Sequence, residues 1–157
     1  MPWLDTRTIT DEEPAEKPKA IFAIDFDGTI VTNNFPYIGK PNPGAIEVLQ
    51  ELQKLGYRLI LLTMRSDEKL HEAIVYCNKA GINFWGYNEN PEQEKWSNSP
   101  KVYANVYVDD AGAGIPLMHD ENQKPCVDWT KLRELFVSWE VLPPLEAGDG
   151  TKTFEIK

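Results

Sequence analysis

The stretch that decides the fold is Ile21-Phe22-Ala23-Ile24-Asp25-Phe26-Asp27-Gly28-Thr29. Its first four residues are apolar, which is typical of a strand buried on both faces of a parallel sheet. The apolar run ends abruptly in two aspartates and a glycine. Because open parallel sheets place their sites beyond the carboxyl ends of the strands, Asp25 and Asp27 are the first candidate site residues.

Helical and strand patterns alternate along the rest of the chain. Asn42 is expected to cap a helix that ends at Gly56, a strand is expected over residues 58–62, and Ser66 is expected to cap a helix reaching about residue 80. Strands at 82–86 and 105–108, a loop at 88–101 and a last helix capped by Thr130 follow. This order predicts an α/β fold: a Rossmann-like three-layer sandwich with a mainly parallel central sheet.

The chain of 157 residues is expected to hold one domain. We expect a flexible N-terminal arm at 1–19, a catalytic domain at 20–140 and a C-terminal tail at 141–157. Cys77 and Cys126 are far apart and match no disulfide or zinc pattern, so we expect a reduced, cytoplasmic protein. No apolar run approaches the length of a membrane span, so no membrane contact is expected.

Acidic residues are in excess, with 25 Asp and Glu against 16 Lys and Arg and a formal net charge of -9. This balance disfavours non-specific binding of long nucleic acids, which needs a basic surface. It also disfavours a polybasic contact with membranes. A local excess of carboxylates can instead mark a metal site, so the location of the acids matters more than their number.

Polar residues follow each of the main expected strands: Asp25 and Asp27, then Thr63, then Asp109 and Asp110. A parallel sheet would bring them to one edge, where four carboxylates repel one another unless they bind protons or a cation. Ligands that are all oxygen suit a hard ion such as Mg2+. A carboxylate can also attack phosphorus, and a second carboxyl two residues on can move the proton of the leaving group.

Ile24-Asp25-Phe26-Asp27-Gly28-Thr29-Ile30-Val31 resembles the first motif of the haloacid-dehalogenase-like (HAD) hydrolases. Leu61-Leu62-Thr63 resembles their second motif, and Lys101 stands where their third-motif lysine would lie. Val106-Tyr107-Val108-Asp109-Asp110 resembles the fourth motif in its form with two aspartates. The resemblance covers roughly residues 20–138, which is most of the chain.

The resemblance implies a role for each matching position. Asp25 would be the nucleophile and Asp27 the general acid and base. The Asp25 side chain, the Asp27 backbone carbonyl and Asp110 would hold Mg2+, with Asp109 acting through water or holding Lys101. The phosphoryl group would be bound by Thr63 and Lys101, helped by the Gly28 and Met64 amides. Lys95 competes with Lys101 for the lysine role, and Arg65, just after the second motif, is a candidate ligand for a substrate anion.

The resemblance departs from larger family members because no cap domain fits in the chain. Only about 14 residues, 30–43, separate the first motif from the next helix, and the second gap is filled by a helix, a strand and a loop. No large cap domain is therefore expected, and the open cleft would admit a large substrate or be covered by another subunit of a homo-oligomer.

The sequence thus predicts a magnesium-dependent phosphomonoester hydrolase, a HAD-type phosphatase that acts through an aspartyl-phosphate. Its partner would be a phosphorylated small molecule or the phosphorylated end of a larger substrate. The sequence does not decide whether that larger substrate is a nucleic acid. The alternatives are a phosphotransferase of the same fold, a phospho-receiver domain, and a binding module that keeps the fold without catalysis.

Overall fold

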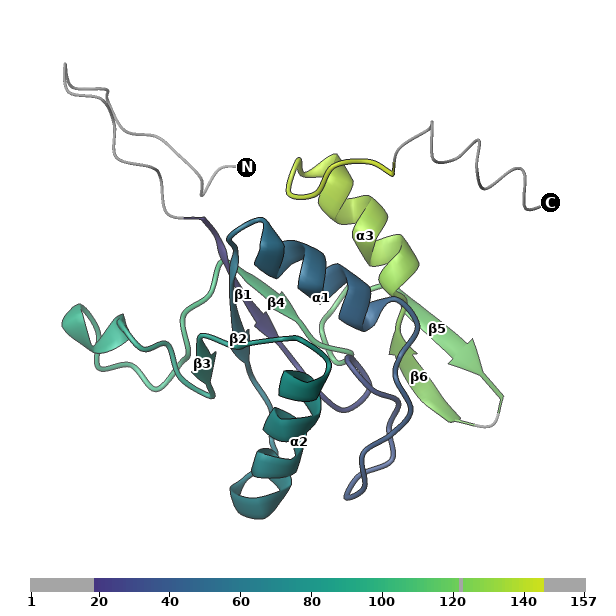
Figure 1. The fold of residues 1–157 in the computed structure, drawn as a ribbon, viewed down its shortest axis with the longest axis horizontal. Helices are drawn as coiled ribbons and strands as arrows, with labels where there is room; N and C mark the ends of the chain where they lie inside the picture. Colours follow the sequence, from purple (N-terminus) through teal and green to yellow (C-terminus); the bar gives the residue numbers. More distant parts are fainter. Residues whose placement is uncertain (1–18, 122, 146–157) are drawn as a thin grey trace.

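The computed structural model describes residues 19–121 and 123–145. Its centre is a parallel sheet of four strands in the order β3-β2-β1-β4 (Figure 1). The strands are β1 (Ile21–Ile24), β2 (Arg58–Leu61), β3 (Gly86–Tyr87) and β4 (Val106–Val108). Because β1 pairs with β2 on one side and β4 on the other, the residues that follow these three strands meet at one edge.

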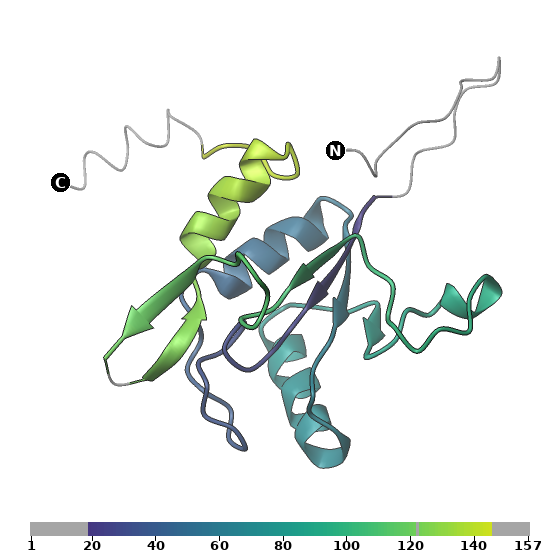
Figure 2. The same cartoon turned by 180° about the vertical axis from the view of Figure 1, so that it is seen from behind.

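Three helices pack on the same face of the sheet: α1 (Ala45–Lys54), α2 (Asp67–Lys79) and α3 (Trp129–Ser138). Right-handed crossovers from β1 to β2 and from β2 to β3 require α1 and α2 to share a face. The connection from β3 back to β4 runs in the opposite direction, so it crosses the other face (Figure 2). This connection holds one short 3-10 helix, η1 (Gln93–Lys95), and buries a smaller cluster that includes Ile21 and Ile60.

The predicted α/β class and parallel central sheet are confirmed, and the described residues contain no large cap domain. On the second face, Val102 and Ala104 of the connection from β3 to β4 pack on the sheet, and no long helix covers that face among the described residues. Within the described ranges, no helix is both long and apolar enough to cross a membrane.

A two-stranded antiparallel hairpin stands beside the main sheet and was not predicted from the sequence (Figure 1). It consists of β5 (Leu117–Asp120) and β6 (Gln123–Val127). Its outer part is exposed, and only Cys126 and Val127 of β6 are buried. Such a hairpin has too few buried apolar residues to give the alternating pattern that reveals a strand.

Three local predictions were wrong. Gly44, at φ +84, occupies the N-cap of α1, while the Asn42 amide is buried and donates to the Thr29 and Val127 carbonyls. Asp128, and not Thr130, caps α3 by accepting a hydrogen bond from the Lys131 amide at 3.1 Å. The third strand was placed at 82–86, but the residues that pair with β2 are those of β3.

The folded part extends at both ends to the limits of the described residues. Val141 and Leu142 are 3% exposed, and the Tyr57 hydroxyl donates to the Val141 carbonyl, so the packed core passes the boundary predicted at residue 140. The flexible arm predicted at 1–19 and the tail predicted at 141–157 lie mostly outside the described residues.

Candidate active site

The loop that follows β1 is held in place by distant parts of the chain. The Asp25 amide donates to the Val108 carbonyl at 2.9 Å, which continues the pairing of β1 with β4. The Thr29 carbonyl accepts hydrogen bonds from Asn42 Nδ2 at 2.9 Å and from Trp129 Nε1 at 2.7 Å. Because these contacts are buried, they fix the backbone that presents the first two candidate aspartates.

Asp25, Asp109 and Asp110 converge at the carboxyl ends of β1 and β4. Each offers a carboxylate oxygen, and these atoms lie within 4.8 Å of one another. The Thr29 hydroxyl donates to Asp25 Oδ2 at 2.8 Å and accepts from the Asp110 amide at 3.2 Å. The cluster thus contains three of the four aspartates predicted for the site, and Thr29 holds two of them together.

Gly28 makes the close approach of Asp110 possible. Its φ is +82, and a Cβ atom at this position would collide with the Asp110 carboxylate and lie 2.5 Å from Asn33 Nδ2. The Gly28 amide donates to the Val31 carbonyl at 2.7 Å. This amide is thus already paired within the protein, and its predicted contact with substrate stays a prediction. What the structure shows for Gly28 is that its missing side chain leaves room for the Asp110 carboxylate.

The crowded carboxylates resist ionisation. Burial raises the pKa of Asp25 from 3.8 to about 8, with a further increase from the nearby Asp109 charge, although the Thr29 hydrogen bond opposes it. Burial also raises the pKa of Asp110, although the neighbouring Asp25 and Asn33 side chains oppose the rise. A cation would replace the proton that these groups otherwise need, and a set of carboxylate oxygens fits Mg2+.

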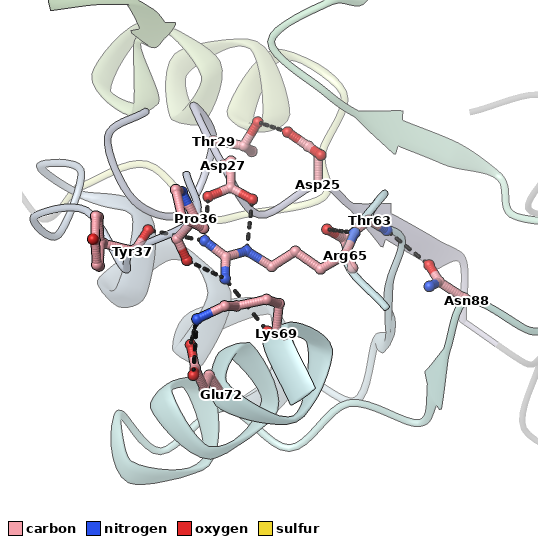
Figure 3. A network of polar contacts seen from close by, with 10 residues as sticks. All are labelled: Asp25, Asp27, Thr29, Pro36, Tyr37, Thr63, Arg65, Lys69, Glu72 and Asn88. Atoms are coloured by element: carbon pink, nitrogen blue, oxygen red, sulfur yellow. Dashed lines mark hydrogen bonds and ion pairs between the residues drawn. The ribbon is translucent and has the colours of Figure 1, made fainter. Parts of the chain in front are cut away.

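The Asp27 side chain does not join the cluster; it faces Arg65, as Figure 3 shows. Arg65 Nε donates to Asp27 Oδ2 and Nη2 to Asp27 Oδ1, both at 2.8 Å. The exposed fractions are 1% for the Arg65 side chain and 18% for that of Asp27. This is a largely buried, bidentate ion pair, which is the strongest geometry available to these groups.

Arg65 also ties the loop after the first motif to α2. Its Nη1 donates to the Pro36 and Lys69 carbonyls, and its Nη2 donates to the Tyr37 carbonyl at 2.9 Å (Figure 3). With Asp27, these acceptors occupy all five N–H groups of the guanidinium. No donor of Arg65 is left over for a substrate anion in this structure, and its predicted contact with such an anion stays a prediction.

Thr63 and Met64 do lie at the same sheet edge, where β2 ends. The Thr63 hydroxyl accepts from the Arg65 amide at 3.1 Å, and its own proton can still be donated. The Thr63 amide donates to Asn88 Oδ1 at 2.8 Å. Among the described residues, nothing accepts a hydrogen bond from the Met64 amide, so it can serve an anion.

Neither candidate lysine reaches the aspartates. Lys101 is exposed, and its Nζ lies over the Tyr107 ring, 5.6 Å from the ring centroid. Lys95, on η1, has its Nζ 4.0 Å from a carboxylate oxygen of Glu92. In the described part of the chain no ion pair joins either lysine to Asp25, Asp109 or Asp110. The structure therefore does not bring the expected third-motif lysine to the cluster.

Three residues that contact the site were not predicted from the sequence: Thr29, Asn33 and Asn88. Thr29 was part of the quoted motif, so its position carried a signal. Asn88 has φ +52, a conformation in which asparagine is enriched, and it follows the short strand β3. Asn33 lies in a loop without periodicity, so no pattern indicated that its side chain would lie beside that of Asp110.

The fold and the site together define an α/β domain with a carboxylate cluster at the carboxyl ends of its parallel strands. A solved structure of a conserved protein from Bacteroides thetaiotaomicron is 34% identical to the chain, with a TM-score of 0.62. The match covers 77% of this chain and 91% of that one. The chain therefore belongs to the same family as this conserved protein. No protein-family model and no curated protein matches the chain.

Proposed function

We propose that the protein is a magnesium-dependent phosphomonoester hydrolase of the HAD type that acts through an aspartyl-phosphate on Asp25. The observation that carries the proposal is the convergence of Asp25, Asp109 and Asp110, with carboxylate oxygens within 4.8 Å of one another. This cluster follows the two strands whose sequences resemble the first and fourth HAD motifs. The Thr29 hydrogen bonds to the cluster add support, since they give the first motif a second contact with the fourth.

The side chains of Asp25, Asp109 and Asp110 would hold the magnesium ion. When bound, the ion neutralises the carboxylates and part of the charge on the phosphoryl group. The Thr63 hydroxyl and the Met64 amide have protons free to bind the phosphoryl oxygens. Such fixed donors supply most of what phosphoryl transfer requires from a protein.

In the proposed reaction an Asp25 oxygen bonds to phosphorus while the bond from phosphorus to the substrate alcohol breaks, and the alcohol takes a proton from the Asp27 carboxyl. Water then attacks phosphorus and gives a proton back to Asp27, while the acyl phosphate bond breaks and frees phosphate and Asp25. Both Asp27 oxygens accept hydrogen bonds from Arg65 in the structure. Proton transfer therefore requires the Asp27 carboxyl to leave this pair during the reaction.

A second candidate is a binding module that holds a cation and a phosphorylated ligand without hydrolysing it. Two observations favour it: Asp27 is paired with Arg65, and Lys101 lies against Tyr107. In both candidates the partner is a phosphorylated small molecule or the phosphorylated end of a larger substrate. A cytoplasmic location and a homo-oligomer that covers the cleft stay predictions.

One assay separates the two candidates. Purified protein should hydrolyse p-nitrophenyl phosphate with magnesium, and Asp25→Asn should abolish the activity while the protein stays folded. Asp67→Asn is the matched control, because Asp67 is an exposed acid at the start of α2. Hydrolysis that persists in Asp25→Asn or in excess chelator contradicts the mechanism. Calorimetric binding of magnesium without any hydrolysis supports the binding module.

A further inference from the structure

A polar cleft lies between the loop 32–40 and the β5–β6 hairpin, and its volume is about 530 Å³. Ligand pockets in proteins range over roughly 300–1,000 Å³. Asn33 lines the cleft, and its side-chain amide meets the Asp110 carboxylate in the space beside Gly28, where a Cβ atom would touch both. The cleft therefore opens beside the carboxylate cluster.

Hydrogen bonds hold both walls of the cleft: the loop is closed on itself, and the hairpin is bonded to the first motif. In the loop, the Thr32 amide donates to the Lys40 carbonyl at 2.8 Å, and the Lys40 amide donates to Thr32 Oγ1 at 3.0 Å. In the hairpin, Val127 donates its amide hydrogen to the Gly28 carbonyl at 3.0 Å. The β5–β6 hairpin thus forms a wall next to the site. The described residues contain no large cap domain that could form such a wall instead.

The side chains that line the cleft both donate and accept hydrogen bonds. Asn34 offers an amide, Lys40 offers a cation, and Gln123 donates to Asp120 Oδ2 at 3.2 Å while its own carbonyl oxygen stays an acceptor. The lining holds one lysine and one aspartate, so its formal charges cancel, and Ile38 is its one large apolar residue. Hydroxyl groups, each of which donates and accepts, match such a lining better than apolar groups do.

We propose that this cleft binds the alcohol part of a polyhydroxylated phosphomonoester of about the size of a sugar phosphate. The inference rests on the proposed function, because the phosphate of this ligand would lie at Asp25. It goes further in naming the substrate class and in giving Asn34, Lys40 and Gln123 the role of recognising hydroxyl groups.

The test compares two esters that carry phosphate on a methylene next to a six-membered ring: glucose 6-phosphate and cyclohexylmethyl phosphate. With magnesium, the kcat/KM for glucose 6-phosphate should be the larger of the two. Asn34→Ala, Lys40→Met and Gln123→Ala should each lower the ratio of the two kcat/KM values by about three- to tenfold, which is the effect of losing one hydrogen bond. Asn78→Ala, at an exposed position near the end of α2, should leave the ratio unchanged.

Equal kcat/KM values for the two esters, or variants that lower both values alike, overturn the inference while leaving the hydrolase intact. If p-nitrophenyl phosphate is hydrolysed but neither ester is, the inference is overturned and the hydrolase stands. If none of the three is hydrolysed, the proposed function fails and the cleft is tested by binding. In that case, calorimetry on the magnesium-loaded protein should show tighter binding of glucose 6-phosphate than of cyclohexylmethyl phosphate. Equal or absent binding of both esters overturns the inference independently of catalysis.

Discussion

Replacing Arg65 by methionine should destabilise the protein strongly. The Arg65 side chain is 1% exposed and makes all five of its hydrogen bonds inside the protein, two of them to Asp27. Removing it leaves the Asp27 carboxylate, 18% exposed, without its counter-charge and leaves three backbone carbonyls without a donor. Loss of one partner from a buried ion pair costs about 3–5 kcal/mol, a large share of the roughly 5–15 kcal/mol that stabilise a domain.

The matched control is Arg133→Met. Arg133 also forms a bidentate pair, with Glu51 at 3.0 and 2.7 Å, but the two side chains are 15% and 31% exposed. Its loss should cost only about 1 kcal/mol, because water screens a pair of this kind. Free energies of unfolding measured in urea, with chelator present, give both values. If Arg65→Met costs no more than Arg133→Met, the reasoning about burial is refuted. Asp27→Asn tests the same pair should Arg65→Met fail to fold.

Three further outcomes are expected. Gly28→Ala should lower the free energy of unfolding by about 1–2 kcal/mol, because alanine is strained in the left-handed backbone, and should weaken magnesium binding, because the new Cβ collides with Asp110. The control is Gly114→Ala, where φ is +83 and no atom lies within 4 Å. Urea unfolding of this variant should show the same loss of stability, and a magnesium titration should show unchanged binding. In chelator, the free energy of unfolding should fall as pH rises from about 4 to about 8, because folded Asp25, with its pKa raised by burial to about 8, keeps a proton that the unfolded chain releases. Magnesium should reverse that fall, and a pH series of urea unfolding with and without the ion checks both signs. Lys101→Ala should reduce hydrolysis far less than the roughly hundredfold that losing a donor to the phosphoryl group costs, because Lys101 lies over Tyr107.

The sequence predicted the parts of the fold that depend on local periodicity. The apolar run of β1, the apolar stripe of α1 and the Ser66 cap of α2 are strong signals, and those elements lie where they were expected. Caps were harder, because Asn42 and Gly44 are both suitable residues and the choice depends on the buried carbonyls that Asn42 reaches in the folded chain. The β5–β6 hairpin was missed because its outer residues are polar and exposed.

The candidate site also has a part that the sequence predicts and a part that it does not. Topology alone brought Asp25, Asp109 and Asp110 together, because adjacent parallel strands end at one edge. The pairing of Asp27 with Arg65 could not be read from the sequence, since it joins positions that are 38 residues apart through the fold of two loops. Lys101 was placed by its position in the motif order, which does not determine where a side chain in a long loop points.

The central claim is that Asp25 becomes phosphorylated during turnover. Borohydride added during steady-state hydrolysis of p-nitrophenyl phosphate with magnesium reduces an aspartyl-phosphate to homoserine, which peptide mass spectrometry locates. The account predicts this conversion at Asp25 in the magnesium reaction, and its absence when substrate is omitted or when magnesium is removed by chelator. Hydrolysis that proceeds with an unmodified Asp25, or with the modification at another residue, would contradict it.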